Sequence, residues 1–570
     1  MKRILSYYKF YKFKLVLIII VKIIGTVLDL VIPFLLSFIL DKILPNIDVN
    51  NYLNIIYYGL LMILCSVLAF IFSFKANQMA SYIGSKCAEI LRNDLFKKIE
   101  NLSLEQVDEI SMPSLISRIS TDTYNENQLY NMILRIGLRA PVLFFGGIIA
   151  SLLLNVKLTL IMLVCIPVVF FIIFLIGKIG IPLFSSIQNS LDYLVQTLRE
   201  DMTGIRVIKA LAREDYERNR YDKVNKKVIE YEIKSAKVMN VLNPLVTLIM
   251  NICLTLVVLF GAILFSKNHN DVTSGQIIAF LSYFNIILTS MVSMSRIFII
   301  YSKAKASAER INYVFDLKTD DNNIKNDVSS HFIEFRNVSF SYSKKELNLK
   351  NINFTIEENQ SFGLIGATGS GKTTLLNLLL GFYKVDEGEI FFNYKNIKSY
   401  SKNDLLINFG IVFQNDLLFN MSIKDNVDFY RNLNNLDINK ALYTAQADFA
   451  FKMGLDKIID AKGNNLSGGQ KQRLLIARAL VSSPKILILD DATSALDYKT
   501  DSLFRKSLKE NYIDTSLIVV SQRISSLINL DKILIIDHGK IANYGKHEDL
   551  IKESKIYQEI YLSQMGEQNA

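Results

Sequence analysis

Residues 361–374 read SFGLIGATGSGKTT, an apolar run that passes through a glycine-rich turn into a helical stretch. Glycines let the backbone N–H groups of such a turn curl around a phosphate, and the N-terminus of the following helix adds positive potential. Lys372 is then placed to reach the β- and γ-phosphates of a nucleotide, and Thr373 to ligate Mg²⁺. These residues predict a buried strand, a phosphate-binding turn and a helix.

Two further motifs lie downstream of this turn. Residues 486–490 read ILILD, an apolar strand that ends in Asp490, the expected second Mg²⁺ ligand of a phosphoryl-transfer site. Before it, LSGGQ at 466–470 opens a helix whose small first residues also suit a bound phosphate. Together the motifs predict an α/β P-loop domain that binds ATP with Mg²⁺.

The sequence before this domain changes in composition. Alternating sequence (HFIEFRNVSFSY) begins at His331, and the polar run DLKTDDNNIKNDVSS at 316–330 indicates a linker. The chain has 570 residues, 51% of them hydrophobic, and a mean hydropathy of +0.26. Because this is more apolar than a soluble domain, the first half is expected in a membrane. No basic repeat accompanies the net charge of +10, so cytoplasmic loops facing anionic lipid explain it and no nucleic-acid partner is expected.

Six apolar stretches in the first half are long enough to cross a bilayer, which takes about 20 residues. They are 14–40, 54–74, 133–154, 158–181, 241–265 and 277–300. The first is too long for the apolar core of a signal peptide and is expected to be retained. The predicted fold is therefore an α-helical domain of six membrane helices fused to the α/β P-loop domain.

The flanking charges predict the orientation of these helices. Lysine and arginine precede the first stretch with no acidic residue among them, so the N-terminus is expected in the cytoplasm. The loops after the first and fifth stretches are short and should face outward, whereas connections of about 55 and about 60 residues should be cytoplasmic. The charged sequences at 89–109 and 199–237 indicate helices that continue past the membrane. Both termini of a bacterial cell-membrane protein are thus expected in the cytoplasm.

Charged residues inside the apolar stretches are candidates for function, because a charge in lipid is costly. They are Lys22, Asp29, Arg135, Arg139, Lys178 and Arg296. Arg135 and Lys178 lie near cytoplasmic ends, where long side chains reach water. Asp29 is the deepest, about two helical turns from Lys22 on the same face, and is a candidate for lining a translocation path.

Cysteine and histidine spacing excludes a structural metal site. The four cysteines, Cys65, Cys87, Cys165 and Cys253, are far apart in helical or apolar sequence, and the four histidines are scattered. We expect the cysteines to be buried as small apolar residues.

The phosphate loop, LSGGQ and ILILDDATSALD, in this order and spacing, resemble the nucleotide-binding domain of ATP-binding cassette (ABC) transporters. LSGGQ is the most specific of the three. The resemblance extends over nearly the whole chain. In the membrane half, SLISRISTDT (114–123), EDMTGIRVIKALARED (200–215) and KASAERI (305–311) are similar to the exporter-type, multidrug-like branch.

The resemblance implies a role for each matching residue. Tyr342 would stack on adenine, although it could instead be an ordinary strand aromatic, and Gln414 would sense the γ-phosphate and Mg²⁺. The phosphates would be held by Gly366, Ala367, Thr368, Gly369, Ser370, Gly371, Lys372, Thr373 and Thr374. The LSGGQ residues that would contact the ATP of the opposite subunit are Ser467, Gly468, Gly469 and Gln470. Turns near Pro113 and near Glu214 would dock on nucleotide-binding domains.

Three positions depart from the family pattern. The catalytic glutamate is replaced by Asp491, the switch histidine by Gln522, and the Gly-Glu pair before LSGGQ by Asp460 and Ala461. An aspartate withdraws the carboxylate by one C–C bond, about 1.5 Å, and a misplacement of about 1 Å can cost about 100-fold in rate. The chain's own ATP site is expected to hydrolyse poorly, as in heterodimers with one degenerate site; neutral variation is the alternative.

The complete prediction is a membrane domain at 1–315, a linker at 316–330 and a nucleotide-binding domain at 331–570. We expect an ATP-hydrolysing half-transporter that pairs with a different half and exports small amphipathic or lipophilic compounds from the lipid membrane. The short segment before the first helix leaves no room for the peptidase domain of some peptide exporters. Two alternatives remain open: an importer on the same fold, and a regulatory subunit that binds ATP without pumping.

Overall fold

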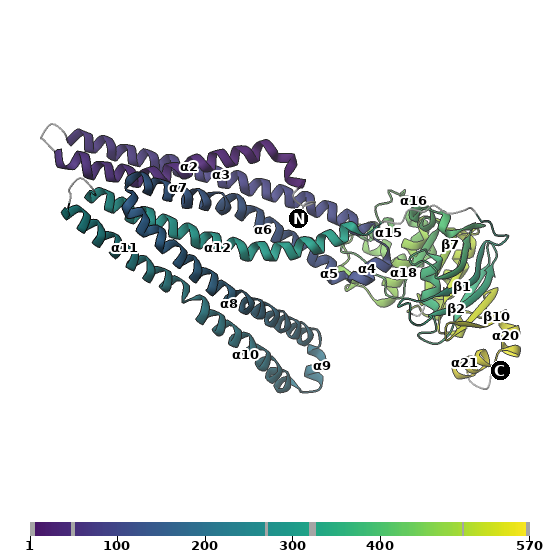
Figure 1. Ribbon diagram of the computed structural model, residues 1–570. Helices are drawn as coiled ribbons and strands as arrows, with labels where there is room; N and C mark the ends of the chain where they lie inside the picture. The colour runs from purple at the N-terminus through teal and green to yellow at the C-terminus, as the bar shows by residue number, and fades with distance from the viewer. Residues whose placement is uncertain (1–5, 47–51, 268–271, 319–326, 493–494, 566–570) are drawn as a thin grey trace. The chain divides into compact units, whose positions relative to one another are not determined.

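The computed structural model describes residues 6–46, 52–267, 272–318, 327–492 and 495–565 (Figure 1). It divides into two compact units. The first comprises Met1–Leu102 and Ile110–Leu317, and the second comprises Ser103–Glu109 and Lys318–Ala570. Most of the linker expected at 316–330 lies outside the described residues, since 319–326 are not among them.

The first unit is helical throughout its described part. Its elements are η1 (Lys9–Tyr11), α2 (Lys12–Phe38), η2 (Ile39–Ile43), η3 (Leu44–Asn46), α3 (Tyr52–Glu100), α5 (Met112–Ser117), η4 (Arg118–Asp122), α6 (Thr123–Met132), η5 (Ile133–Gly137), α7 (Arg139–Leu154), α8 (Val156–Thr203), α9 (Ile205–Ala210), α10 (Glu214–Met239), α11 (Leu242–Lys267) and α12 (Ser274–Asp316). Three of them, η2, η4 and η5, are π-helical turns within longer helices.

Six helical stretches among the described residues are long and apolar enough to cross a membrane. They are Ser6–Ile43, Leu53–Glu100, Met112–Leu154, Val156–Thr203, Glu214–Ile263 and Ser274–Met294. Each overlaps one of the six stretches predicted from the sequence, which confirms that prediction. The charged sequence at 89–109 continues α3 as far as Glu100 and then forms most of α4 (Leu104–Ile110). The charged sequence at 199–237 continues α8 as far as Thr203, where Gly204 ends the helix, and then forms α9 and most of α10.

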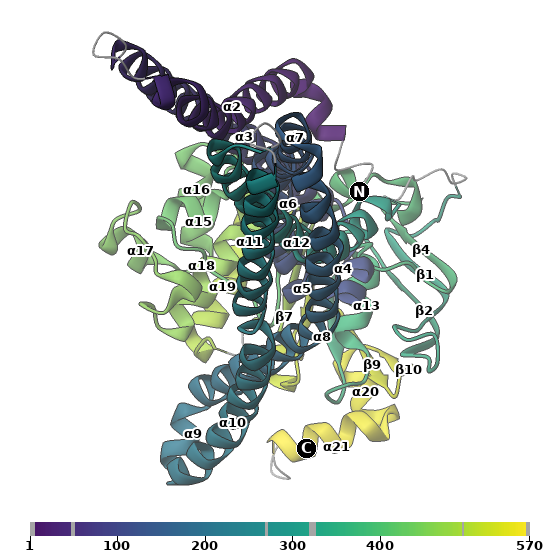
Figure 2. The ribbon, with the colours of Figure 1, turned by 60° about the vertical axis from the view of Figure 1, so that its left-hand side comes forward.

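Close approach at small residues holds the helices of this unit together. A Cβ on Gly147 of α7 would lie 2.8 Å from Cγ1 of Ile287 on α12, and one on Gly146 would lie 2.5 Å from Cδ1 of Leu30 on α2. In lipid, where apolar burial does not drive association, such contacts between helices are a main source of stability. The elements α8 and α10 lie side by side in both views, joined by the short α9 (Figures 1 and 2).

All four cysteines are buried, as expected, and two of them form a pair that was not predicted from the sequence. Cys165 of α8 and Cys253 of α11 form a disulfide with their Cα atoms 6.6 Å apart, whereas Cys65 and Cys87 are free and buried. Cys165 and Cys253 are 88 residues apart in sequence, so no spacing pattern indicates the pair. Only the packing of α11 against α8 brings them together.

The second unit is an α/β domain with two sheets. Its strands are β1 (Ile333–Phe340), β2 (Leu349–Ile356), β3 (Ser361–Ile365), β4 (Glu387–Phe392), β5 (Lys395–Asn396), β6 (Phe409–Val412), β7 (Ile486–Asp490), β8 (Ser516–Val520), β9 (Lys532–Asp537) and β10 (Lys540–Gly545). Its helices are α4 (Leu104–Ile110), α13 (Lys372–Leu379), η6 (Ile397–Ser399), α14 (Lys402–Leu406), α15 (Ile423–Asp428), α16 (Asn435–Thr444), α17 (Asp448–Met453), η7 (Ala461–Gly463), α18 (Gly468–Leu480), α19 (Tyr498–Asn511), η8 (Ile524–Ser526), α20 (His547–Glu553) and α21 (Lys555–Met565).

The larger sheet has the strand order β10-β9-β3-β8-β7-β6, and all its neighbours are parallel except β10 and β9. The smaller sheet, β2-β1-β4-β5, is antiparallel. The strands predicted at 361–366 and 486–490 are present as β3 and β7, and the helix after LSGGQ is α18. An α/β domain of this kind places its binding residues at the carboxyl ends of the parallel strands.

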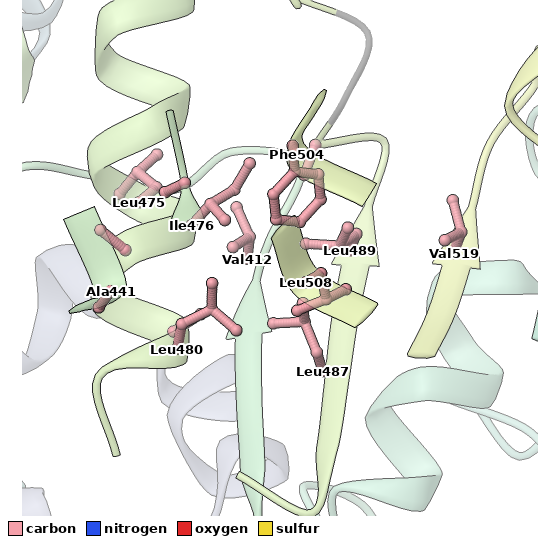
Figure 3. Packing of buried hydrophobic residues seen from close by; sticks show 14 of the residues in the cluster. Val412, Ala441, Leu475, Ile476, Leu480, Leu487, Leu489, Phe504, Leu508 and Val519 are labelled. Carbon is pink, nitrogen blue, oxygen red and sulfur yellow. The ribbon is translucent and has the colours of Figure 1, made fainter. Parts of the chain in front are cut away.

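Alternating residues of the larger sheet enter two different cores. Leu487 and Leu489 of β7 pack with α18 and α19, where Ile476 and Phe504 are buried (Figure 3). Their neighbour Ile488 instead joins the core shared with the antiparallel sheet and α13. Because β7 is buried on both faces, it reads as a continuous apolar run rather than an alternating one.

A buried carboxylate ties two distant parts of the first unit together. Asp122 of η4 has no exposed surface and accepts hydrogen bonds from Nε of Arg310 (2.8 Å) and Oγ of Ser307 (2.8 Å), both on α12. Hydrogen bonds to a charged group are among the stronger ones, since donor and acceptor attract electrostatically. This contact should be a major stabilising interaction of the helical unit.

Replacing Asp122 by alanine should lower the free energy of unfolding by about 2 to 3 kcal/mol, because charge-assisted hydrogen bonds are lost inside the unit. The measurement is the midpoint of thermal unfolding of the detergent-solubilised chain. Glu89→Ala is the matched control, since Glu89 forms an ion pair with Lys86 (2.7 Å) in which both side chains are exposed. Equal shifts in the two variants would contradict the assignment.

Candidate functional site

The loop between β3 and α13 has a backbone that only glycine permits at two positions. Gly371 has φ +112°, in the left-handed region, and a Cβ there would lie 2.7 Å from Cδ2 of Leu349. A Cβ on Gly366 would lie 2.2 Å from the carbonyl oxygen of Ile536. The glycines predicted to shape the turn are therefore required by the fold of the loop itself.

Lys372 folds back over this loop from the start of α13. Its Nζ donates to the carbonyls of Gly366 and Ala367, both at 2.8 Å. Burial lowers its pKa, while Asp490 and Asp491 act in the opposite direction. The ammonium group is thus held at the loop, where it can meet an anion bound by the loop amides.

A cleft of about 550 Å³ opens beside the loop. Ten residues predicted for the site line it: Thr368, Gly369, Gly371, Lys372, Thr373, Thr374, Gln414, Asp490, Asp491 and Gln522. The cleft lies at the carboxyl ends of β3, β7 and β8, which pair in parallel. Residues from four separate segments of sequence therefore meet at one edge of the sheet.

Adjacent carboxylates make the centre of the cleft acidic. Asp490, at the end of β7, is only 5% exposed. Burial and the neighbouring Asp491 raise its pKa to about 6, against the lowering effects of Lys372 and a hydrogen bond from Thr373. A bound cation would oppose this shift by favouring the ionised carboxylate.

The oxygen donors at this point fit a hard divalent cation. Asp490 offers a carboxylate, Thr373 a hydroxyl and Gln414 an amide oxygen, and all three line the same cleft. Oxygen ligands of these kinds are those that Mg²⁺ takes, with phosphate oxygens supplying others. The loop offers a further polar group, since Oγ of Ser370 is buried and has no hydrogen-bond partner among the described residues.

Asp491 and Gln522 line the cleft from the ends of the neighbouring strands β7 and β8. Asp491 has φ +53°, and its N–H donates to the carbonyl of Val520 (2.9 Å). This left-handed conformation turns the chain immediately after β7. The pairing of Asp490 with Val520 in the β7–β8 register places the segment that contains Gln522 beside it.

The last described helix holds this segment, which the sequence did not predict. Nε2 of Gln564 in α21 donates to the carbonyl of Gln522 (2.7 Å), and its Oε1 accepts from the N–H of Ile524 (2.8 Å). A single glutamine in a helix carries no motif, so no sequence signal marks the contact. The same is true of Asn348 and His538, which also line the cleft.

The LSGGQ motif is not part of this cleft. Ser467 and Gln470 form a reciprocal capping box at the start of α18: Gln470 N donates to Ser467 Oγ (3.3 Å), and Ser467 N donates to Gln470 Oε1 (2.9 Å). Ser467 and Gly468 are exposed, and none of Ser467, Gly468, Gly469 and Gln470 lines the cleft. The motif therefore presents an open helix N-terminus on the surface of the unit.

Tyr342 lies beside the cleft rather than in its lining. Its ring packs edge-on against Phe340 (4.8 Å between centroids) and Tyr383 (5.0 Å), and its side chain is 46% exposed. Oδ1 of Asn348, a lining residue, accepts a hydrogen bond from its backbone N–H (3.0 Å). An exposed aromatic face next to the phosphate loop suits stacking with a base.

A short piece of the first half belongs to the second unit. Asp108 of α4 accepts a hydrogen bond from the hydroxyl of Tyr383, and Gln106 donates to the carbonyl of Lys318 (3.0 Å). Burial raises the pKa of the Tyr383 hydroxyl, and the hydrogen bond to Asp108 raises it further. The segment grouped with the second unit is Ser103–Glu109, a few residues before the turn near Pro113, and docking by that turn stays a prediction. Sequence alone does not reveal this grouping because the contact joins residues 275 positions apart.

Comparison with known proteins agrees with this architecture. The chain matches the ABC transporter transmembrane region over residues 15–291 and the ABC transporter domain over residues 349–494. It is 32% identical over 520 residues to the uncharacterized ABC transporter ATP-binding protein YfiB of Bacillus subtilis (strain 168), with 90% of each chain covered. It is 30% identical over 507 residues to the ATP-dependent lipid A-core flippase of Haemophilus influenzae (strain 86-028NP), with 87% of this chain and 85% of that protein covered.

A solved structure has the same fold. The bacterial Atm1-family ABC exporter with ATP bound has a TM-score of 0.83 and 21% sequence identity, and the match covers 98% of this chain and 99% of that chain. The ABC domain implies ATP binding and an ATPase-type transport activity, and the six apolar helices indicate a multi-pass membrane protein. This chain therefore belongs to the ABC transporter family, as an exporter-type half-transporter.

Proposed function

We propose that this chain is the degenerate-site half of a heterodimeric ABC exporter. It binds ATP in its own cleft, hydrolyses it slowly, and supplies LSGGQ to the ATP held by its partner. The observation that carries this proposal is that the motifs of ATP hydrolysis lie in two separate places. Asp491 and Gln522 line the chain's own cleft, whereas Ser467 and Gly468 are exposed outside it.

Within the cleft, the chain's residues have distinct tasks. The loop from Gly366 to Thr374 surrounds the phosphates, and Lys372 balances their charge. Tyr342 stacks on the base. Asp490, Thr373 and Gln414 would hold Mg²⁺, which would supply positive charge next to the phosphate oxygens. Burial and the neighbouring Asp491 raise the pKa of Asp490 to about 6. A cation bound beside Asp490 would stabilise its ionised form against this effect.

The weak step is activation of water. The shorter side chain of Asp491 withdraws a general base by about 1.5 Å relative to glutamate, and such a base must lie within hydrogen-bond reach of the proton it takes. Gln522 has an amide where an imidazole is usual, so it donates a hydrogen bond but does not exchange a proton near neutral pH. The site therefore holds ATP for long periods and biases the pair between inward-facing and outward-facing states.

The substrate proposed is a small amphipathic or lipophilic compound that moves outward from the cell membrane. The similarity to an ATP-dependent lipid A-core flippase supports a lipophilic cargo. The cation-rich start of the chain supports cytoplasmic termini. The partner is a second ABC half with its own intact glutamate.

Mutations at the two motifs should have unequal effects on the assembled pair. Ser467→Arg places a bulky cation where the partner's γ-phosphate is held, so the ATPase rate should fall about 100-fold or more. Asp491→Asn should lower the ATPase rate of the pair only a few-fold, because this chain's own weak site contributes only a small part of the total rate. Steady-state ATPase rates measure both. Ser467→Thr is the control, because it keeps the hydroxyl that caps α18, and equal loss in Ser467→Arg and Asp491→Asn would refute the division of roles.

Restoring the family residues should activate the chain by itself. The purified chain should bind ATP with little turnover, whereas Asp491→Glu combined with Gln522→His should raise turnover about 10- to 100-fold, because the carboxylate regains its reach. Phosphate release and nucleotide binding are measured side by side. Lys372→Ala in the restored background should abolish both. Brisk turnover by the parent chain would contradict the proposal.

The orientation can be tested by labelling single cysteines in a chain whose four native cysteines are replaced by alanine. A cysteine at Asn46, at the end of the first helix, should react with a membrane-impermeant maleimide on intact cells, because short, weakly charged loops face outward. A cysteine at Glu105 should react only after the cells are opened. The reverse pattern would invert the proposed topology.

A further inference from the structure

The membrane unit contains a second cavity, separate from the ATP site, with a volume of about 570 Å³. Its lining comes from α2, α3, α6, η5, α7 and α12, which pack together within this unit (Figures 1 and 2). Three cations line it: Lys22, Arg135 and Arg139. No carboxylate is among the described residues that line it, so the lining carries a net positive charge. The volume is that of a typical small-molecule site.

These cations have little opposing charge nearby. Lys22 is 2% exposed, and its Nζ donates to the neutral amide oxygen of Asn77 (2.9 Å). Arg139 forms an ion pair with Asp29 (2.9 Å), which is not among the residues that line the cavity. In the described part of the chain, Asp29 is the only carboxylate paired with any of the three. Thus Arg139 rather than Asp29 lines the cavity, and the ion pair with Asp29 partly neutralises the charge of Arg139.

Keeping three cations at this place is energetically costly. A charged residue in a membrane helix is disfavoured unless it faces a polar cavity or a partner. Arg135 also lies in η5, a π-helical turn, which departs from the regular hydrogen bonding of the helix. Such turns occur frequently at functional sites. A ligand bound by these cations would account both for their retention in the membrane unit and for the π-helical turn at Arg135.

The remaining polar side chains of the cavity lining already donate hydrogen bonds within their own helices. The hydroxyls of Thr289, Ser290 and Ser293 donate to backbone carbonyls of their own helix, α12. The side-chain amides of Gln128 and Asn131 donate to side chains one turn earlier in α6. The guanidinium and ammonium groups are therefore the strongest donors available to a ligand, and they select an anion.

Apolar side chains complete the lining. Ile136 and Leu143 lie on the same helical stretch as Arg135 and Arg139, and Met132 precedes them. A ligand that fills this cavity would meet cations at one part of its surface and hydrocarbon at another. That combination matches an amphipathic molecule with a charged head.

We propose that this cavity binds the anionic headgroup, a phosphate or similar oxyanion, of an amphipathic substrate. The inference rests on the proposed transport function and names the substrate class. Arg135 and Arg139 hold the oxyanion through their planar donor groups, and Lys22 adds a third charge. Asp29 competes with the substrate for Arg139. The apolar tail lies along Ile136 and Leu143.

The test measures binding to the full-length chain in phosphatidylcholine nanodiscs. The chain contains no tryptophan, so Leu143→Trp supplies a single fluorescent reporter in the lining. Two probes share one nitroxide-labelled alkyl tail, which quenches tryptophan, and differ in the head: a phosphate or its neutral phosphocholine counterpart. The phosphate probe should bind about tenfold more tightly or better. Equal affinities would overturn the proposal.

Variants in the reporter background should shift that preference in opposite directions. Arg135→Gln and Arg139→Gln should each weaken phosphate-probe binding about tenfold, while Asp29→Asn should strengthen it a few-fold by removing the competitor. Lys178→Gln is the matched control, because Lys178 is an exposed cation of α8 outside the lining, and should change nothing. The ratio between the two probes separates charge recognition from general damage. Weakening by Asp29→Asn, or equal effects on both probes, would refute the assignment.

Competition then identifies the source of the headgroup. Displacement of the phosphate probe by phosphatidylglycerol in the nanodisc supports a bilayer lipid, and displacement by soluble glycerol 3-phosphate supports a soluble compound. Displacement by neither would overturn anion binding. These measurements need no partner and no turnover, so their failure is distinguishable from failure of the ATPase tests of the proposed function.

Discussion

The parallel pairing of β3, β8 and β7 is the constraint on which the ATP site depends. Parallel strands all end at the same edge of a sheet, so the phosphate loop, Asp490 and the segment of Gln522 meet there although more than 100 residues separate the first from the others. Burial of β7 on both faces fixes its register, since a shift by one residue would exchange Leu487 and Leu489 with Ile488 between two packed cores. The positions of the cleft residues at this edge of the sheet are therefore set by the pairing of its apolar strands.

A related constraint governs the membrane unit. Backbone groups in lipid must be satisfied within the chain, which leaves long helices as the available structure. Inside such a bundle a charged side chain is costly unless it pairs with another group or binds a ligand. Asp122 has partners on α12, and its role is structural. Lys22 and Arg135 have none that is acidic among the described residues, and the same physical argument leads there to a ligand.

The sequence predicted the parts of the molecule that are specified locally. The six apolar stretches, the strands β3 and β7, the loop glycines and the LSGGQ helix follow from periodicity and from residue types within a few turns of chain. Contacts between distant segments were not predictable in this way. The Cys165–Cys253 bond, the ion pair of Asp29 with Arg139 and the position of Ser103–Glu109 each depend on how helices pack, and packing leaves no mark at a fixed spacing. Asn348 and His538 line the cleft from loops without motifs, for the same reason.

The contact of Gln564 with the Gln522 segment has a consequence for how the chain is made. Synthesis proceeds from the N-terminus, and early domains begin to fold before later ones are complete. The phosphate loop, Asp490 and Gln522 all leave the ribosome before α21, which lies 40 residues or more behind the segment that it holds. A nascent chain can therefore contain every nucleotide-binding motif while the backbone of Gln522 and Ile524 still lacks the two hydrogen bonds from Gln564. The ATP site therefore gains its last two backbone contacts only after α21 has been synthesised.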